Sequence, residues 1–90
     1  MVGVLSLWEA VRRRRMRERR DNLALILRDK GFTCAYPLSP REREYVNEHG
    51  VMVTLFHDAS WEASDEHGRI FASASGGNAA FRLKSVVKGE

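Results

Sequence analysis

Apolar and polar residues follow two different periods along this chain, a helical one before residue 30 and a period of two after residue 51. Residues 6–30 contain neither glycine nor proline and are rich in leucine, arginine, alanine and glutamate, which favour helices. Ser6 suits an N-cap with Glu9 three residues later, and Gly31 suits the position that follows a helix. The sequence therefore predicts a basic N-terminal helix over residues 6–30.

One side of this helix is apolar at both ends and polar in the middle. At 100° per residue, the apolar side is formed by Val4, Leu7, Trp8, Val11, Leu25 and Ile26. Between them, the same stripe holds Arg14, Arg15, Glu18 and Asn22. A helix that packs along a core would not place polar groups there. We expect the middle turns to project beyond the body or to meet a partner, and residues 23–27, which are apolar nearly all round, to pack in the core.

A short strand and a second, short helix are expected next. Residues 31–36 are compatible with a strand. Ser39 would then cap a helix with Pro40 at its first position and Glu42 three residues after the cap. Residues 41–48 would form about two helical turns, which Gly50 ends.

From Val51 onwards the pattern predicts strands. Residues 51–57 are apolar on both faces, which is typical of a central strand. Further strands are predicted at Trp61–Ser64, Arg69–Ser75 and Ala79–Val87, with turns at Asp65–Gly68 and Gly76–Asn78. In the last strand, Phe81, Leu83 and Val87 would alternate with Arg82 and Lys84. The antiparallel sheet is thus expected over residues 51–87.

Together these elements predict one α+β domain over residues 1–90, with a three- to four-stranded antiparallel sheet covered on one face by helices. We expect Trp61 and the phenylalanines Phe56, Phe71 and Phe81 to pack in its core. Cys34 is the only cysteine, which excludes an intramolecular disulfide, and we expect it to be a small buried hydrophobe.

Charge divides the chain into a basic segment and a mildly acidic remainder. Residues 12–20 hold seven arginines and Glu18, so they carry +6, whereas the whole chain carries +3 and everything outside this segment sums to −3. We refer to these arginines as the arginine run: Arg12, Arg13, Arg14, Arg15, Arg17, Arg19 and Arg20. Guanidinium groups make bidentate contacts with phosphates, so the run predicts a non-enzymatic protein that binds DNA or RNA.

A second hypothesis places the function in protein–protein contact. Leu7, Trp8 and Val11 would form an apolar anchor for a partner protein or for a homodimer through the N-terminal helix, and the arginine run would meet an acidic surface. Such a chain would act as a small inhibitor or adaptor, possibly encoded by a mobile element. The acidic segment from Asp58 to Glu66 could also dock onto a basic surface of another protein.

A third hypothesis concerns the polar residues after the central strand. Two histidines and four carboxylates lie within eleven residues: His57, Asp58, Glu62, Asp65, Glu66 and His67. A small metal-dependent hydrolase would need several of them to converge on one point. Their spacing matches no metal-binding motif, so we assign no catalytic residue, metal ligand or cofactor. The apolar stretches are too short to cross a membrane, and we expect a cytoplasmic protein with no membrane partner.

Overall fold

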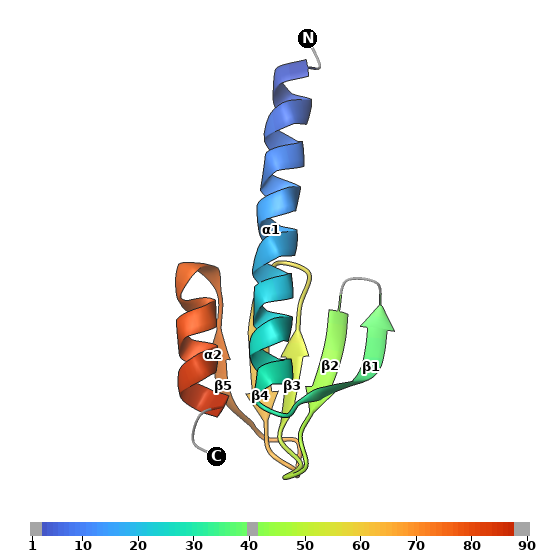
Figure 1. Ribbon diagram of the computed structural model, residues 1–90, viewed down its shortest axis with the longest axis vertical. Helices are drawn as coiled ribbons and strands as arrows, with labels where there is room; N and C mark the ends of the chain where they lie inside the picture. The colour runs from blue at the N-terminus through green and yellow to red at the C-terminus, as the bar shows by residue number, and fades with distance from the viewer. Residues whose placement is uncertain (1–2, 40–41, 88–90) are drawn as a thin grey trace.

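The computed structural model describes residues 3–39 and 42–87, and it contains a long helix, an antiparallel sheet and a short C-terminal helix (Figure 1). The elements are α1 (Gly3–Asp29), β1 (Thr33–Ser39), β2 (Glu42–Val46), β3 (Met52–Leu55), β4 (Trp61–Ser64), β5 (Ile70–Ala74), the 3-10 turn η1 (Gly76–Asn78) and α2 (Ala79–Val87). The expected α+β class is confirmed. The sheet, however, has five strands in the order β1-β2-β3-β4-β5, where three or four were predicted over residues 51–87.

The predicted N-terminal helix is present, but it begins at Gly3 and not after Ser6. Nothing in Gly3, Val4 or Leu5 stops a helix once Ser6 and the following residues are helical. The C-terminal end agrees with the prediction: Gly31 adopts a φ of +88° directly after the last turn. Phe32 donates its backbone N–H to the carbonyl of Leu27 at 2.9 Å, which closes the helix end.

Residues 42–46 form strand β2, so the short helix predicted over residues 41–48 is wrong. The cap signals at Ser39 and Glu42 are local, and an isolated helix of two turns has little stability of its own. As a strand, the segment pairs with β1 and β3, and Tyr45 lies opposite both Cys34 and Val53 with its side chain fully buried. Pro40 lies outside the described residues.

Residues 79–87 form helix α2, so the last predicted strand is also wrong. Leu83 and Val87 fit a period of two and a period of four equally well. Ala79 is buried and also fits both periods, so the deciding position is Phe81, which a strand would place on the same face but which is 76% exposed. Ala79, Leu83 and Val87 thus form one helical face, and the indole Nε1 of Trp61 donates to the carbonyl oxygen of Ala79 at 2.9 Å.

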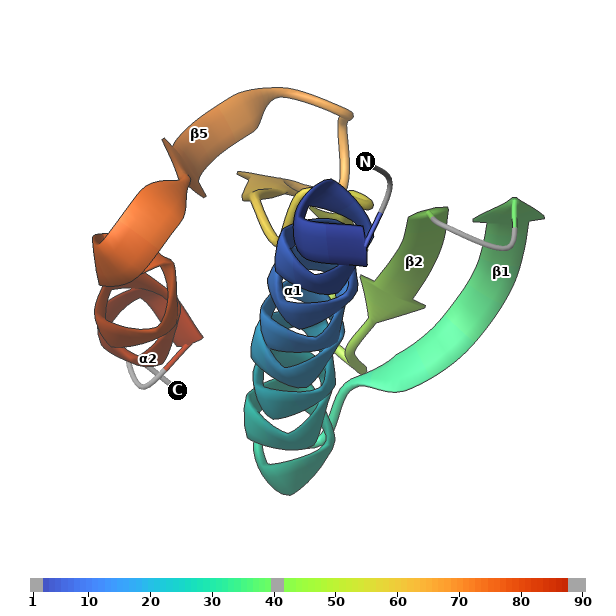
Figure 2. The ribbon, with the colours of Figure 1, turned by 90° about the horizontal axis from the view of Figure 1, so that it is seen from above.

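The core lies between one face of the sheet and the two helices, which run side by side (Figures 1 and 2). Seen along α1, the strands curve around the helix, with α2 on one side and β1 and β2 on the other (Figure 2). The sheet supplies Tyr45, Val53, Leu55, Trp61 and Ala63, α1 supplies Leu23, Ile26 and Leu27, and α2 supplies Leu83 and Val87. Trp61 is buried as expected.

Three predicted core residues lie at the surface. Phe81 occupies the outer face of α2, and Phe71 is the extra residue where the register between β4 and β5 shifts. Cys34 is exposed because it belongs to the edge strand β1, which lies away from both helices. Phe56, which directly follows β3, is only partly buried.

Two hairpin turns have nearly the same sequence and the same hydrogen bonds. Residues 47–50 are Asn-Glu-His-Gly and residues 65–68 are Asp-Glu-His-Gly. The Oδ1 atom of Asn47 accepts backbone N–H groups from residues 49 and 51, and Oδ1 of Asp65 accepts those of residues 67 and 69, all at 2.9–3.0 Å. Gly50 and Gly68 end the turns with φ values of +84° and +81°. The turn predicted at residues 65–68 is therefore present.

We expect alanine to be tolerated less well at Gly50 than at Gly68. Alanine at Gly68 should lower the free energy of unfolding by about 1–2 kcal/mol, the cost of a left-handed backbone for a residue with a Cβ atom. The loss at Gly50 should be larger, because a Cβ atom there would lie 3.0 Å from Cβ of Glu66 in the other turn, whereas Gly68 has free space. Urea denaturation of the two variants measures the difference. Equal losses would contradict the close approach of the two turns.

Candidate functional site

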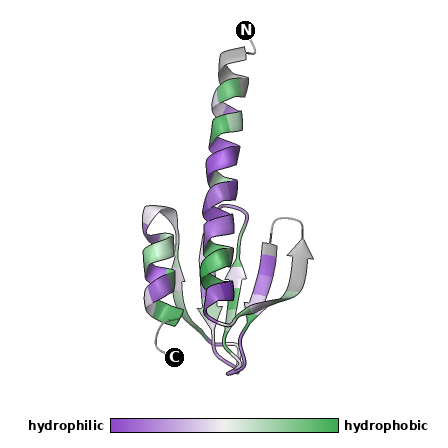
Figure 3. Cartoon of the chain, in the orientation of Figure 1, coloured by the Kyte–Doolittle hydropathy of each residue, from purple (hydrophilic) through white to green (hydrophobic). Residues whose placement is uncertain are grey.

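The N-terminal half of α1 projects beyond the body (Figures 1 and 3), and the arginine run begins in this half and continues to Arg20, where the helix meets the body. A helix of 27 residues is about 40 Å long, and the molecule measures 52 × 24 × 22 Å. From Leu7 onwards, the first fully buried residue of α1 is Leu23, so the core holds the C-terminal part of this stretch. Projection beyond the body is observed for the turns before Met16, and contact with a partner stays a prediction.

Most of the arginine run is exposed and lacks an ionic partner. Six of the seven guanidinium groups are exposed, and Arg20 is half-buried where the helix meets the body. Among the described side chains, the one ion pair of the run joins Arg13 to Glu9 across one helical turn, at 3.9 Å. This contact is long and exposed, so it contributes little. The positive charge of the run is therefore not neutralised by the rest of the described chain.

Met16 divides the body-facing side of the run into two flanks. It lies on the same side of α1 as Leu23 and Leu27, it is partly buried, and it packs against the core. At 100° per residue, Arg13, Arg17 and Arg20 lie to one side of Met16, and Arg12, Arg15 and Arg19 lie to the other. Arg14 and Glu18 point away from the body. The run is thus not an even ring of charge.

The first flank forms a groove with the loop that joins β3 to β4. This groove has a volume of about 540 Å³ and is lined by Arg12, Arg13, Met16, Arg17, Arg20, His57 and Asp58. The sequence analysis grouped His57 and Asp58 with the polar residues of the third hypothesis, and the fold places these two beside the arginine run. A carboxylate therefore lies within the groove that holds most of the arginines.

Asp58 is held in its ionised form by its neighbour Ser60. Its Oδ1 atom accepts the hydroxyl of Ser60 at 2.5 Å and the backbone N–H of Ser60 at 3.0 Å. The hydroxyl hydrogen bond is the main cause that lowers the pKa of Asp58 below the usual range of an aspartate. Ala59, which lies between Asp58 and Ser60 in the sequence, is buried. Its φ is +64°, a value that L-residues rarely adopt.

The second flank forms a groove without a carboxylate. It has a volume of about 280 Å³ and is lined by Trp8, Val11, Arg12, Arg15, Met16 and Arg19. Trp8 is 64% exposed, so its indole ring is accessible from solvent. The spacing of four, seven and eleven residues from Trp8 to Arg12, Arg15 and Arg19 puts all four on one side of α1.

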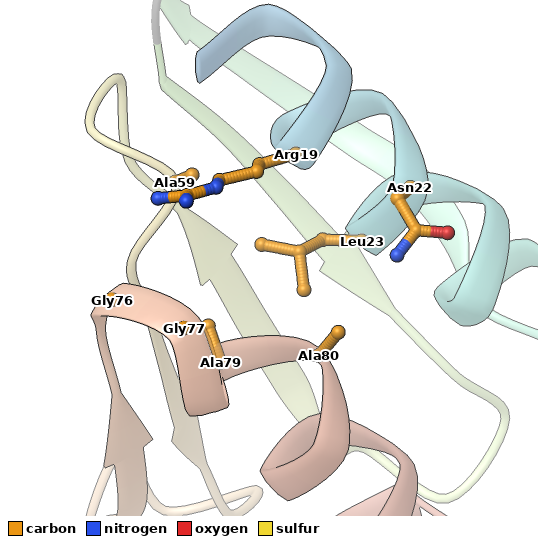
Figure 4. A pocket seen from close by; sticks show the side chains of 8 residues that line it. All are labelled: Arg19, Asn22, Leu23, Ala59, Gly76, Gly77, Ala79 and Ala80. Carbon is orange, nitrogen blue, oxygen red and sulfur yellow. The ribbon is translucent and has the colours of Figure 1, made fainter. Parts of the chain in front are cut away.

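Arg19 also covers a small pocket at the junction of α1 and α2 (Figure 4). The pocket has a volume of about 130 Å³, and its lining includes Leu23, Ala59, Gly76 and Gly77. In Figure 4 the side chain of Arg19 extends from α1 towards Ala59, while Leu23 lies between α1 and the start of α2. Arg19 thus belongs both to this pocket and to the groove that contains Trp8.

The predicted apolar anchor is accessible. Leu7 is 67% exposed and Trp8 is 64% exposed, whereas Val11 is partly buried. All three lie on the projecting part of α1, and within the described part of the chain the body leaves Leu7 and Trp8 uncovered. This exposure leaves the hypothesis of a protein partner open.

The polar residues of the third hypothesis do not converge. His57 and Asp58 precede β4 and His67 follows it, so they lie at opposite ends of that strand. Glu62 lies within β4 on the face opposite to Trp61 and Ala63, away from the helices. Among the described residues, no three histidine, cysteine, aspartate or glutamate side chains are grouped so as to hold a metal ion. The geometry gives the proposed hydrolase no support.

Removing the Ser60 hydroxyl should raise the pKa of Asp58. In the Ser60→Ala variant, the carboxylate loses its main hydrogen bond and should titrate at higher pH, which NMR of the Asp58 carboxyl carbon measures directly. A lowered pKa stabilises the fold above the unfolded-state pKa, and this contribution is lost as the pH falls through the folded-state pKa. The variant should therefore lose less stability on acidification than the parent. An unchanged titration midpoint would contradict the assigned cause.

None of the α-helices within residues 3–39 and 42–87 combines the length and the apolar character needed to cross a membrane. No protein-family model, no curated protein and no solved structure matches this chain.

Proposed function

We propose that this protein binds the phosphates of a nucleic acid, DNA or RNA, through the arginine run, and that it acts as a binding protein without enzymatic activity. The observation that carries the proposal is the exposure and the ion pairing of the seven guanidinium groups. Six are exposed, and among the described side chains one alone has an ionic partner, at 3.9 Å. Uncompensated guanidinium groups on a projecting helix are available to an anionic partner.

Phosphate is the anion that suits these groups best. Arginine presents donors in a planar fork that fits two phosphate oxygens, and each neutralised phosphate releases counterions from the nucleic acid. If all seven arginines contacted duplex phosphates, the slope of log K against log salt would approach about −6, which is the upper limit for this run. The affinity would then fall by more than roughly 10³-fold between about 50 and 200 mM salt.

The shape of the molecule supports the same proposal. The first turns of the arginine run lie beyond the body, so a long polyanion can approach them without meeting the sheet (Figure 1). The acidic balance of the remaining chain, −3, would orient the molecule with the helix towards the polyanion. Both grooves beside Met16 are lined by arginines of the run, so guanidinium groups are present on either flank.

A protein partner is the alternative that a specific observation favours. Leu7 and Trp8 are both more than 60% exposed, and large apolar side chains at the centre of an interface contribute much of its binding energy. Under this alternative the protein is a small inhibitor or adaptor that meets an acidic protein surface or a nucleoprotein complex. A homodimer through α1 would bury the same residues, but it would bring two arginine runs together. Under this alternative, the segment from Asp58 to Glu66 offers an acidic docking surface to a basic protein.

Replacing all seven arginines by glutamine should abolish nucleic-acid binding. Glutamine preserves helix propensity and length but removes the charge. Fluorescence anisotropy with labelled single-stranded and double-stranded oligonucleotides, at about 50 and 200 mM salt, should show salt-sensitive binding for the parent protein and none for the variant. Circular dichroism checks that the variant keeps its helix.

A lysine variant at the same seven positions is the matched control. It keeps the charge but lacks the bidentate fork, so it should retain salt-dependent binding at reduced affinity. Absence of binding by the parent protein at low salt would overturn the proposal and favour the protein partner. Undiminished binding by the glutamine variant would place the nucleic-acid contacts elsewhere on the molecule.

A further inference from the structure

The two flanks of the arginine run differ in their acidic residues. On the flank of Arg13, Arg17 and Arg20, Glu9 lies 3.9 Å from Arg13, and the ionised Asp58 lines the groove. Both carboxylates would repel an approaching phosphate. The other groove contains no acidic residue in its lining. Arg12 lines both grooves, whereas Arg15 and Arg19 do not line the groove that contains Asp58.

Trp8 lies at the outer end of the groove that lacks a carboxylate. Trp8, Arg12, Arg15 and Arg19 follow one another at spacings of four, three and four residues, so they form one stripe along α1. The stripe extends over about 17 Å from Trp8 to Arg19. Its order is an exposed aromatic ring followed by three guanidinium groups. We call it the Trp8 stripe.

This arrangement matches the chemistry of an unpaired nucleotide chain. Proteins that bind single strands combine a positive groove along the backbone with an aromatic side chain on which a base stacks. In a duplex the base faces are covered by their neighbours, so an exposed indole finds no ring to stack on. A fully charged run without an aromatic residue would bind both forms through phosphates alone. Trp8 therefore adds a preference that charge does not supply.

We propose, on the basis of the function proposed above, that the Trp8 stripe is a binding site for single-stranded nucleic acid. An unpaired base stacks on the indole of Trp8, and successive phosphates of the same strand contact Arg12, Arg15 and Arg19. The small lining residues Gly76 and Gly77 leave space next to Arg19 for the strand to leave the groove. Three neutralised phosphates of a single strand give a salt slope of about −2, well below the limit for the whole run.

The two tryptophans allow the stacking to be measured without a label. Trp61 is 1% exposed and its Nε1 is bound to the carbonyl of Ala79, so its fluorescence should not change. Trp8 fluorescence should be quenched on addition of a short oligothymidylate and should change much less with a duplex of the same length. The Trp8→Phe variant should lose the quenching but keep most of the affinity, because phenylalanine also stacks. Trp8→Ala should bind the oligothymidylate roughly tenfold more weakly.

Two charge-matched triple variants separate geometry from net charge. One carries Arg12→Gln, Arg15→Gln and Arg19→Gln, and the other carries the same change at Arg13, Arg17 and Arg20. Each removes three positive charges from the same helix. The first should lose nearly all binding of the oligothymidylate and most of the salt slope, while the second should keep both within a few-fold of the parent. Circular dichroism confirms that both variants are folded.

The outcomes distinguish this inference from the function on which it rests. If binding is salt-sensitive and depends on the arginines, but Trp8 is not quenched and the two triple variants lose affinity equally, the stripe is wrong and phosphate binding by the run stands. If a duplex is bound as tightly as the single strand with Trp8→Ala unchanged, the stripe is also wrong. If no nucleic acid binds at low salt, both proposals fail and a protein partner for Trp8 becomes the leading hypothesis.

Discussion

The burial of one short helical segment determines the shape of the whole molecule. Leu23, Ile26 and Leu27 fix the C-terminal third of α1 between the sheet and α2, next to Trp61. Starting a helix is the costly step, whereas extending one is nearly free for residues such as arginine, alanine and leucine. The anchored turns therefore serve as the nucleus from which α1 continues beyond the body without further contacts. The projecting part is helical because its far end is packed.

The sequence predicted the fold class and the strands β3, β4 and β5, but it missed β2 and placed a strand where α2 lies. The strand Trp61–Ser64 and the turn after it were found because period two and an Asp-Glu-His-Gly turn occur together. The same turn occurs at residues 47–50 as Asn-Glu-His-Gly, and this repeat could have identified β2 as one side of a hairpin. Capping residues at Ser39 and Glu42 favoured a helix instead, because local signals carry no information on whether neighbouring strands are available for pairing.

The candidate site was predicted in its residues but not in its geometry. The arginine run and the exposure of Leu7 and Trp8 follow from the sequence, since a helix cannot bury seven guanidinium groups. The division of the run into two flanks does not follow from the sequence. It depends on Met16 packing against the body and on the β3–β4 loop bringing His57 and Asp58 next to the run. Sequence spacing alone, however, would have placed Trp8 on one stripe with Arg12, Arg15 and Arg19.

Charge repulsion within α1 favours the binding of a polyanion to the projecting helix. Several arginines stand three or four residues apart, among them Arg12 and Arg15, Arg13 and Arg17, and Arg15 and Arg19. Each such like-charge pair destabilises a helix by about 0.2–0.5 kcal/mol. Among the described side chains, Glu9 alone pairs with the run, so this cost is not relieved within the chain. A polyanion that neutralises the guanidinium groups would remove the repulsion, and binding and helix stability would then increase together.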